Sequence, residues 1–499
     1  MQIAQRQGIL VQPQKRLTDA AVRMIDGVSR QLLEDPGLWC YNAEAAELFQ
    51  RAGARVEPSD DCLRVRVPAA LVDQALDSAP SRVVLGAREP ENRLILDAEE
   101  PRVRFGTGSE ANVWLQVDFP GDQPQFTRLP GSIPRLADSA HLAEHLEHLD
   151  FFIRNVNLCD PQITETNKDV NQFFTSLNHI RKHVQAGLTS LDALEDVLRL
   201  GHLVAGGEAA FRENPLLSFI TCVIKSPLQV VDDTAAKLLA ISRRRVPVVV
   251  SSCPMGGATG PFDEFGMVAQ INAEILAGVV LNQLAAPGAP VLYGAVPVRT
   301  RLDNFNDMYA APEVIHYSHD CAQLARFYRL PCYSSAGVAD AAVPGIQAAA
   351  EKMFTLLAVP AAGAQYIHYA FGLLERTNTF CPEQAILDNA HLDLVKRTYA
   401  PAACETSTPE TILASIREVM RTPEKTFMYH VPLPSRDPVY VRFPLEDDSS
   451  GALGAAHRQY RQLLQEPRQL LPVALQRDIR RHVPGLLDVC FLEKTGDAS

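Results

Sequence analysis

The chain has 499 residues, 46% hydrophobic and 21% charged, a composition that excludes a disordered protein. Acidic residues number 59 and basic residues 47, for a formal net charge of −12. Basic residues cluster only at 243–245, so the sequence does not predict nucleic-acid binding. No apolar run approaches the roughly 20 residues that span a bilayer, so we expect no membrane partner.

The first residues, Met1–Gly8, contain no apolar segment of the kind found in signal peptides. The 10 cysteines are scattered without a Cys-x-x-Cys pair, which is typical of reduced intracellular thiols. We therefore expect a cytoplasmic protein.

Residues 1–100 are predicted to form a small, mainly helical N-terminal cap. Helical patterns cover Leu17–Leu33 and Ala43–Ala52, and Pro68 opens another helix. Between them, Leu63–Val67 alternates like a half-exposed strand.

The middle of the chain alternates short apolar runs with helical segments. Eight runs are predicted strands: Val103–Phe105, Phe151–Val156, His183–Ala186, Leu217–Val223, Val246–Ser251, Pro290–Tyr293, Pro331–Tyr333 and Ala364–Tyr369. Their starts lie 29 to 48 residues apart, enough for the crossover helix that parallel strands require. Three of the helices are predicted at Leu228–Ser242 after Ser226-Pro227, at Asp263–Leu284 with one apolar face, and at Glu313–Tyr328 after Pro312.

This alternation predicts a (β/α)8 TIM barrel over residues 101–400, with a doubly wound sheet as the alternative. Residues 401–499 are predicted to form a helical C-terminal extension. It contains helices at Ala455–Leu464 and Leu475–Val483 and a Pro-rich interruption at Val431–Pro444.

In a barrel, function lies on the loops after the strands. The Gly-rich loop Cys253–Pro261 could cradle an anion or only form a tight turn. Lys225 could anchor an anion or remain solvated, and His368 could be a core histidine or a site residue. Tyr366, Tyr369 and Phe371 could pack in the core or cage a quaternary ammonium by cation–π contact.

The same loops carry motifs that resemble the trimethylamine methyltransferase family. These are Cys253-Pro-Met-Gly-Gly-Ala-Thr-Gly-Pro261, Asn272-Ala-Glu-Ile-Leu-Ala-Gly278, Pro287-Gly-Ala-Pro-Val-Leu-Tyr-Gly294, Ala322-Gln-Leu-Ala-Arg-Phe-Tyr328 with Leu330-Pro331, and Gly106-Thr-Gly108. The resemblance covers residues 15–480. It implies a (β/α)8 barrel that takes a methyl group from a methylamine or quaternary amine and passes it to the cob(I)alamin of a separate corrinoid protein.

Two segments depart from the family pattern. Val298–Phe305 replaces a Met-Asp-Met-Arg-Thr-Gly segment, and Val338–Ala342 keeps Asp340 but lacks the family's lysine. The trimethylamine enzymes of the family carry pyrrolysine in the turn near Ala336-Gly337, where this chain has ordinary residues. The resemblance is therefore to the branch without pyrrolysine, similar to glycine betaine methyltransferase, and a betaine is the expected substrate.

The candidate site residues follow from these loops. Substrate-binding candidates are Glu110, Lys225, Tyr293, Arg299, Ser335, Gly337, His368, Tyr369 and Phe371. Cofactor-binding candidates are Gly256, Gly257 and Thr259. The chain lacks the corrinoid-binding motif Asp-x-His-x-x-Gly, so we expect the corrinoid to arrive on a partner protein. We expect no metal and no tightly bound cofactor on this chain. We also expect the protein to be a homo-oligomer.

Two other functions stay open. One is a zinc-dependent betaine–thiol methyltransferase whose ligands would be Cys222, Cys253 and a third residue such as Cys332. The other is a quaternary-amine binding protein without catalytic activity.

Overall fold

A computed structural model describes residues 4–108, 110–400, 408–427, 451–467 and 469–491. Its central element is a nine-stranded sheet in the order β1-β7-β21-β20-β17-β15-β12-β11-β10. Eight strands are parallel neighbours: β7 (Arg102–Phe105), β10 (Phe151–Ile153), β11 (His183–Ala186), β12 (Leu217–Thr221), β15 (Val248–Ser252), β17 (Val291–Ala295), β20 (Cys332–Ser335) and β21 (Tyr366–His368). Each begins within two residues of its predicted start. The ninth, β1 (Ile9–Leu10), pairs antiparallel with β7.

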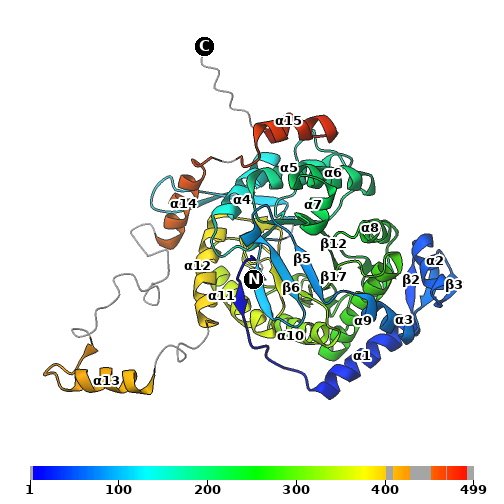
Figure 1. Cartoon of the computed structure of the whole chain (residues 1–499), viewed down its shortest axis with the longest axis horizontal. Coiled ribbons are helices and arrows are strands. Elements are labelled where there is room, and N and C mark those ends of the chain that lie inside the picture. Colours follow the sequence, from blue (N-terminus) through cyan, green and yellow to red (C-terminus); the bar gives the residue numbers. More distant parts are fainter. Residues whose placement is uncertain (1–3, 109, 401–407, 428–450, 468, 492–499) are drawn as a thin grey trace, which may run out of the picture.

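The sheet curls, so that its first and last parallel strands approach each other. Gly106, just after β7, forms a parallel bridge with Phe151 of β10, and the Asp150 N–H donates to the Phe105 carbonyl at 2.7 Å. Helices lie around the outside (Figure 1). They are α4 (Ile133–His145), α5 (Lys168–His179), α6 (Leu194–Ala205), α7 (Glu208–Glu213), α8 (Asp232–Arg243), α9 (Glu264–Ala285), α10 (Pro312–Phe327), α11 (Ile346–Ala358) and α12 (Pro382–Thr398).

A hairpin fills the inside of the curl at the amino ends of the strands. It consists of β5 (Arg82–Leu85) and β6 (Leu94–Asp97), which cross the centre of Figure 1. Its side chains share one buried cluster with inward-facing strand residues, among them Phe151, Val249, Leu292, Tyr333 and Tyr366. The interior is therefore packed at this end.

The N-terminal region contains the predicted helices α1 (Asp19–Glu34), α2 (Ala43–Arg51) and α3 (Ala69–Ser78). It also contributes strands β2, β3 and β4 to a five-stranded sheet in the order β13-β14-β2-β4-β3. The sheet consists of β2 (Leu38–Cys40), β3 (Arg55–Ser59) and β4 (Cys62–Arg66) from the N-terminal region, and of β13 (Ile224–Lys225) and β14 (Gln229–Val230) from the middle of the chain. The prediction that Pro227 opens a helix was wrong, since the β13–β14 hairpin occupies that segment and α8 begins at Asp232.

Helix α9 is enclosed on all sides, whereas its sequence predicted one buried face. Every residue from Met267 to Gln283 is buried, because α1, α2 and α3 cover the side that faces away from the sheet. The helix is long and apolar enough to cross a membrane. However, 83% of its most apolar 18-residue stretch is buried within the protein, as in a core helix.

Smaller elements complete the described structure. One small sheet contains β8 (Val113–Asp118), β9 (Gln125–Pro130), β22 (Leu373–Leu374) and β23 (Thr379–Phe380). Another contains β16 (Met255–Gly256), β18 (Val298–Thr300) and β19 (Asp307–Met308). The C-terminal part has helices α13 (Pro409–Met420), α14 (Gly451–Leu463) and α15 (Val473–His482), while the predicted Pro-rich interruption lies outside the described residues.

Candidate functional site

Two cysteines face the interior where β12 and β15 end. Ile220 and Val249 belong to the interior cluster, so alternation along the strands directs Cys222 and Cys253 to the same face. Both cysteines retain exposed surface. Burial raises the pKa of both thiols, so each side chain combines exposed surface with surrounding protein, and we call the space in front of them the recess.

Four rings form what we call the aromatic cluster beside this recess: Tyr309, Tyr333, His368 and Tyr369. The His368 ring lies 4.2 Å from that of Tyr333 and 3.5 Å from that of Tyr369, centroid to centroid. Tyr309 meets Tyr369 edge-on at 6.0 Å. Burial lowers the pKa of His368 well below its usual value, so the imidazole is neutral. Within the described structure neither of its ring nitrogens has a hydrogen-bond partner.

A carboxylate, Asp307 on β19, faces the same region. Burial is the main cause that raises the pKa of Cys253, Tyr309 and Tyr369, and the charge of Asp307 adds a smaller contribution to each, as expected for a carboxylate near all three groups. Burial raises the pKa of Asp307 itself, against a smaller opposing effect of Arg376. Among the described residues it forms no ion pair within 4.0 Å. Arg376 acts on Asp307 only from beyond that distance, so a cation beside the cluster would find a carboxylate without a direct ion-pair partner among the described residues.

Glu110 lies in an ion network at the neighbouring strand ends. Its carboxylate is 2.8 Å from Arg154 Nη2 and 2.6 Å from Lys168 Nζ, and it accepts a hydrogen bond from Gln172 at 3.2 Å. Burial would raise the pKa of Glu110, but Arg154 and Lys168 outweigh it and hold the pKa below its usual value. The carboxylate is already neutralised, so its geometry suits loop positioning better than cation binding.

Three other predicted residues serve the packing. The Tyr293 hydroxyl donates to Asn272 on α9 at 2.9 Å, so this side chain lies outside the curl. Arg299 donates to the Phe262 carbonyl at 2.9 Å and to the Tyr317 hydroxyl at 3.1 Å, and lies over the Phe262 ring at 3.6 Å. Phe371 is fully buried in the main core. None of the three is brought together with the aromatic cluster.

Lys225 stands exposed on β13, in the outer five-stranded sheet rather than in the curled sheet. The structure therefore does not bring it to the recess. Ser335 and Gly337, by contrast, lie at the end of β20 beside β21, and Ser335 pairs directly with His368.

The Gly-rich loop uses its own backbone donors. The N–H groups of residues 257–260 all donate to carbonyls within the loop, at 2.9 to 3.1 Å. The Thr259 hydroxyl accepts from the Met255 N–H at 2.9 Å, and Gly257 has a φ of +95°. A tight turn therefore accounts for Gly256, Gly257 and Thr259 without a cofactor.

The third proposed zinc ligand lies elsewhere. Cys332 faces the outer core cluster, whereas Tyr333, next to it, faces inward. No group of three or more His, Cys, Asp or Glu side chains in the described part of the chain is arranged to hold a metal ion.

Sequence reasoning missed Asp307 and Tyr309, since it stopped at Phe305. Asp307 and Tyr309 are two residues apart, a spacing that places both side chains on one face of a strand. A pattern of two residues is too short to predict a strand from the sequence.

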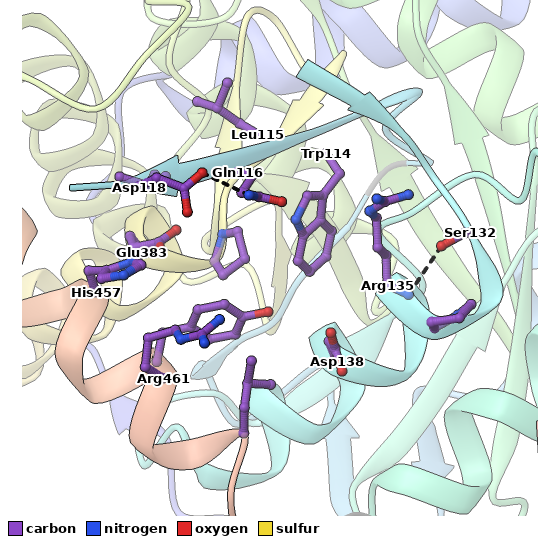
Figure 2. A pocket seen from close by; sticks show the side chains of 15 residues that line it. Trp114, Leu115, Gln116, Asp118, Ser132, Arg135, Asp138, Glu383, His457 and Arg461 are labelled. Atoms are coloured by element: carbon purple, nitrogen blue, oxygen red, sulfur yellow. Dashed lines mark hydrogen bonds and ion pairs between the residues drawn. The ribbon is translucent and has the colours of Figure 1, made fainter. Parts of the chain in front are cut away.

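A second pocket, with a cavity volume of about 370 Å³, lies apart from this site (Figure 2). Trp114 of β8, Asp138 of α4, Glu383 of α12 and Arg461 of α14 all face it. Glu383 pairs with His457 at 2.8 Å, which holds α14 against α12. No predicted site residue lines this pocket.

Comparisons with known proteins identify the family of the chain. The trimethylamine methyltransferase family model matches residues 4–429. The chain belongs to this family. It is 31% identical over 381 residues to a trimethylamine methyltransferase of Desulfitobacterium hafniense (strain DSM 10664 / DCB-2), covering 76% of this chain and 74% of that protein.

Two further relatives bear on the substrate. A trimethylamine methyltransferase of Methanosarcina barkeri is 30% identical over 402 residues, covering 79% and 78% of the two chains. A glycine betaine methyltransferase of D. hafniense (strain Y51) is 27% identical over 384 residues, covering 75% of each. The protein is thus a methyltransferase of a family whose members are named for methylated amines.

Proposed function

We propose that this methyltransferase takes a methyl group from a quaternary ammonium compound of the betaine type and delivers it to a corrinoid carried by a separate protein. The observation that carries the proposal is Asp307, a carboxylate beside Tyr309 and Tyr369 with no ion-pair partner among the described residues. A carboxylate and aromatic faces are the groups that stabilise a quaternary ammonium, which cannot donate a hydrogen bond. The glycine betaine methyltransferase among the relatives supports the same substrate class.

The proposed reaction requires no proton transfer by a side chain of the protein. The methyl carbon–nitrogen bond breaks, its electron pair stays on nitrogen, and a neutral tertiary amine leaves. The neutral His368 and the raised pKa values of the tyrosines fit this requirement, because no group needs to give or take a proton. The cluster holds the ammonium and orients one methyl group toward the open end of the recess.

A corrinoid, when present, supplies a cobalt(I) nucleophile as the methyl acceptor. The exposed surface of Cys222 and Cys253 fits an acceptor that approaches the strand ends from outside. Burial raises the pKa of both thiols and keeps them protonated at neutral pH, so they do not compete for the methyl group.

The curled sheet supports the closed (β/α)8 barrel implied by the family, because the Gly106–Phe151 bridge links its two ends. A cytoplasmic location and a homo-oligomeric state belong to the same proposal. Helix α13 supports the latter, since Ile412, Leu413 and Ile416 are each about half exposed along one side.

The decisive experiment incubates the protein with cob(I)alamin and a panel of methylated amines and follows the cobalamin absorbance. We expect methyl transfer from glycine betaine or a related betaine and none from trimethylamine, since the turn at Ala336-Gly337 lacks pyrrolysine. Transfer from trimethylamine at a comparable rate would refute the substrate class. Calorimetric binding of betaines without any transfer would favour the non-catalytic binding protein.

A further inference from the structure

One fully buried ion pair lies behind the candidate site. Lys352, in the middle of α11, and Asp388, in α12, are both 0% exposed and their charged atoms are 3.0 Å apart. Asp388 also accepts a hydrogen bond from Gln384 at 2.9 Å, and His391 lies 3.6 Å from it. Such a pair is costly to desolvate and does not by itself explain why the fold keeps it.

The remaining contacts of the pair go to two backbone turns. Lys352 Nζ donates to the carbonyl of Gly337, in the turn after β20. Asp388 accepts from the N–H of Gly372 at 2.7 Å, in the turn after β21. Thr355, one helical turn after Lys352, accepts from the Gly337 N–H at 3.0 Å. The two helices thus hold the two turns through a single charge pair.

Both turns need glycine and leave no spare room. Gly337 has a φ of +89°, and a Cβ there would sit 2.8 Å from the Cα of Ala370. Gly372 has a φ of +73°, and a Cβ there would sit 2.4 Å from the Phe380 ring. Gly337 therefore packs directly against Ala370, which lies two residues before Gly372.

Site residues immediately precede these turns. Ser335 and Ala336 come before Gly337, and the Ala336 N–H donates to the His368 carbonyl at 3.2 Å. Tyr369 comes three residues before Gly372 and has a left-handed backbone, with φ at +71°. A side chain in that conformation stays in place only when the surrounding structure enforces it.

We propose that Lys352 and Asp388 are positioning residues, which fix the turns after β20 and β21 and thereby place His368 and Tyr369 against the substrate. Neither side chain touches the recess. The placement follows from the contacts alone, and only the identity of the bound amine rests on the proposed function.

The test uses a variant that is expected to keep the stability of the fold but to lose the contacts that position the two turns. Replacing both members of a buried pair by apolar residues usually preserves folding, so Lys352→Met/Asp388→Leu should fold while losing both turn contacts. Asp388→Asn is the second variant: its amide oxygen can still accept from the Gly372 N–H, but Lys352 loses its counter-charge, so folding of this variant is checked by circular dichroism. The matched control is Lys182→Met: Lys182 is 5% exposed and donates to the carbonyls of Ala143 and Leu146 at the opposite ends of the strands.

Two readouts are needed. The first is the rate at which iodoacetamide labels Cys253, measured by peptide mass spectrometry against the exposed Cys159 as internal reference. The second is the separate measurement of KM and kcat for the best methylated amine. We expect the double variant to label Cys253 about tenfold faster and to raise KM about tenfold, with a smaller effect from Asp388→Asn and none from the control.

Labelling and KM equal to those of Lys182→Met in both variants would overturn the proposal. The labelling rate does not depend on catalysis, so it stays informative if the parent protein transfers no methyl group from any amine tested.

Discussion

At the scale of single residues, Asp307 is the group whose charge has most to gain from a bound cation. We expect Asp307→Asn to raise KM for a quaternary amine about tenfold, which corresponds to roughly 1.4 kcal/mol of lost attraction. Asp303→Asn is the matched control, because Asp303 lies on the same hairpin but is exposed and paired with Arg301 at 2.7 Å. Equal changes in KM for the two variants would refute the role of Asp307.

The recess cysteines allow a second prediction at this scale. Cys222→Ser and Cys253→Ser, separately and together, should keep methyl transfer within about threefold of the parent, since protonated thiols take no part in it. The zinc-dependent alternative predicts loss of activity in both. Metal analysis of the purified parent protein, which that alternative expects to contain stoichiometric zinc, provides the independent check.

At the scale of elements, Glu274 connects α9 to two loops. It is buried and accepts from Ser252 at 2.6 Å, Ser226 at 2.7 Å, Gln270 at 3.0 Å and the Leu228 N–H at 3.1 Å. We expect Glu274→Ala to lower the free energy of unfolding by about 2–4 kcal/mol, because four donors lose their acceptor. Glu274→Gln, which retains one carbonyl acceptor, should cost less in chemical denaturation. Equal losses would show that packing, rather than hydrogen bonding, dominates.

The loop of the β5–β6 hairpin contacts His183, and this contact gives a prediction about pH. His183 on β11 contacts the Gly86 carbonyl at 2.8 Å and Ser218 at 2.7 Å, and burial lowers its pKa to about 4. The unfolded chain, with a histidine pKa near 6.5, binds more protons between these values, so stability falls as pH drops from about 6.5 to 4.

The size of that loss is on the order of 3 kcal/mol. The difference in unfolding free energy between the parent and His183→Gln should therefore shrink as the pH is lowered through this range. A difference that stays constant with pH would contradict a neutral, buried His183.

The elements also show how far sequence reasoning reaches. The eight strands were predictable because β-branched runs and the lengths between them depend on local sequence. The β13–β14 hairpin was not, since β14 is held by pairing with the distant β2. The site residues likewise fall into those that local sequence predicts and those that depend on distant contacts. His368 and Tyr369 lie where a strand end predicts them, whereas the outward direction of Tyr293 and Phe371 depends on which neighbours pack against them.

At the scale of the whole molecule, the β5–β6 hairpin has a consequence for the order of events. It packs the amino end of the curled sheet, so within the described part of the chain the recess opens toward the carboxyl ends of the strands. Under the proposed function, an amine and the protein that accepts its methyl group would both approach from that end, and the larger one would cover it. The amine therefore binds first and its demethylated product leaves last. An excess of acceptor protein should consequently slow turnover at low amine concentration and cease to do so once the amine is saturating.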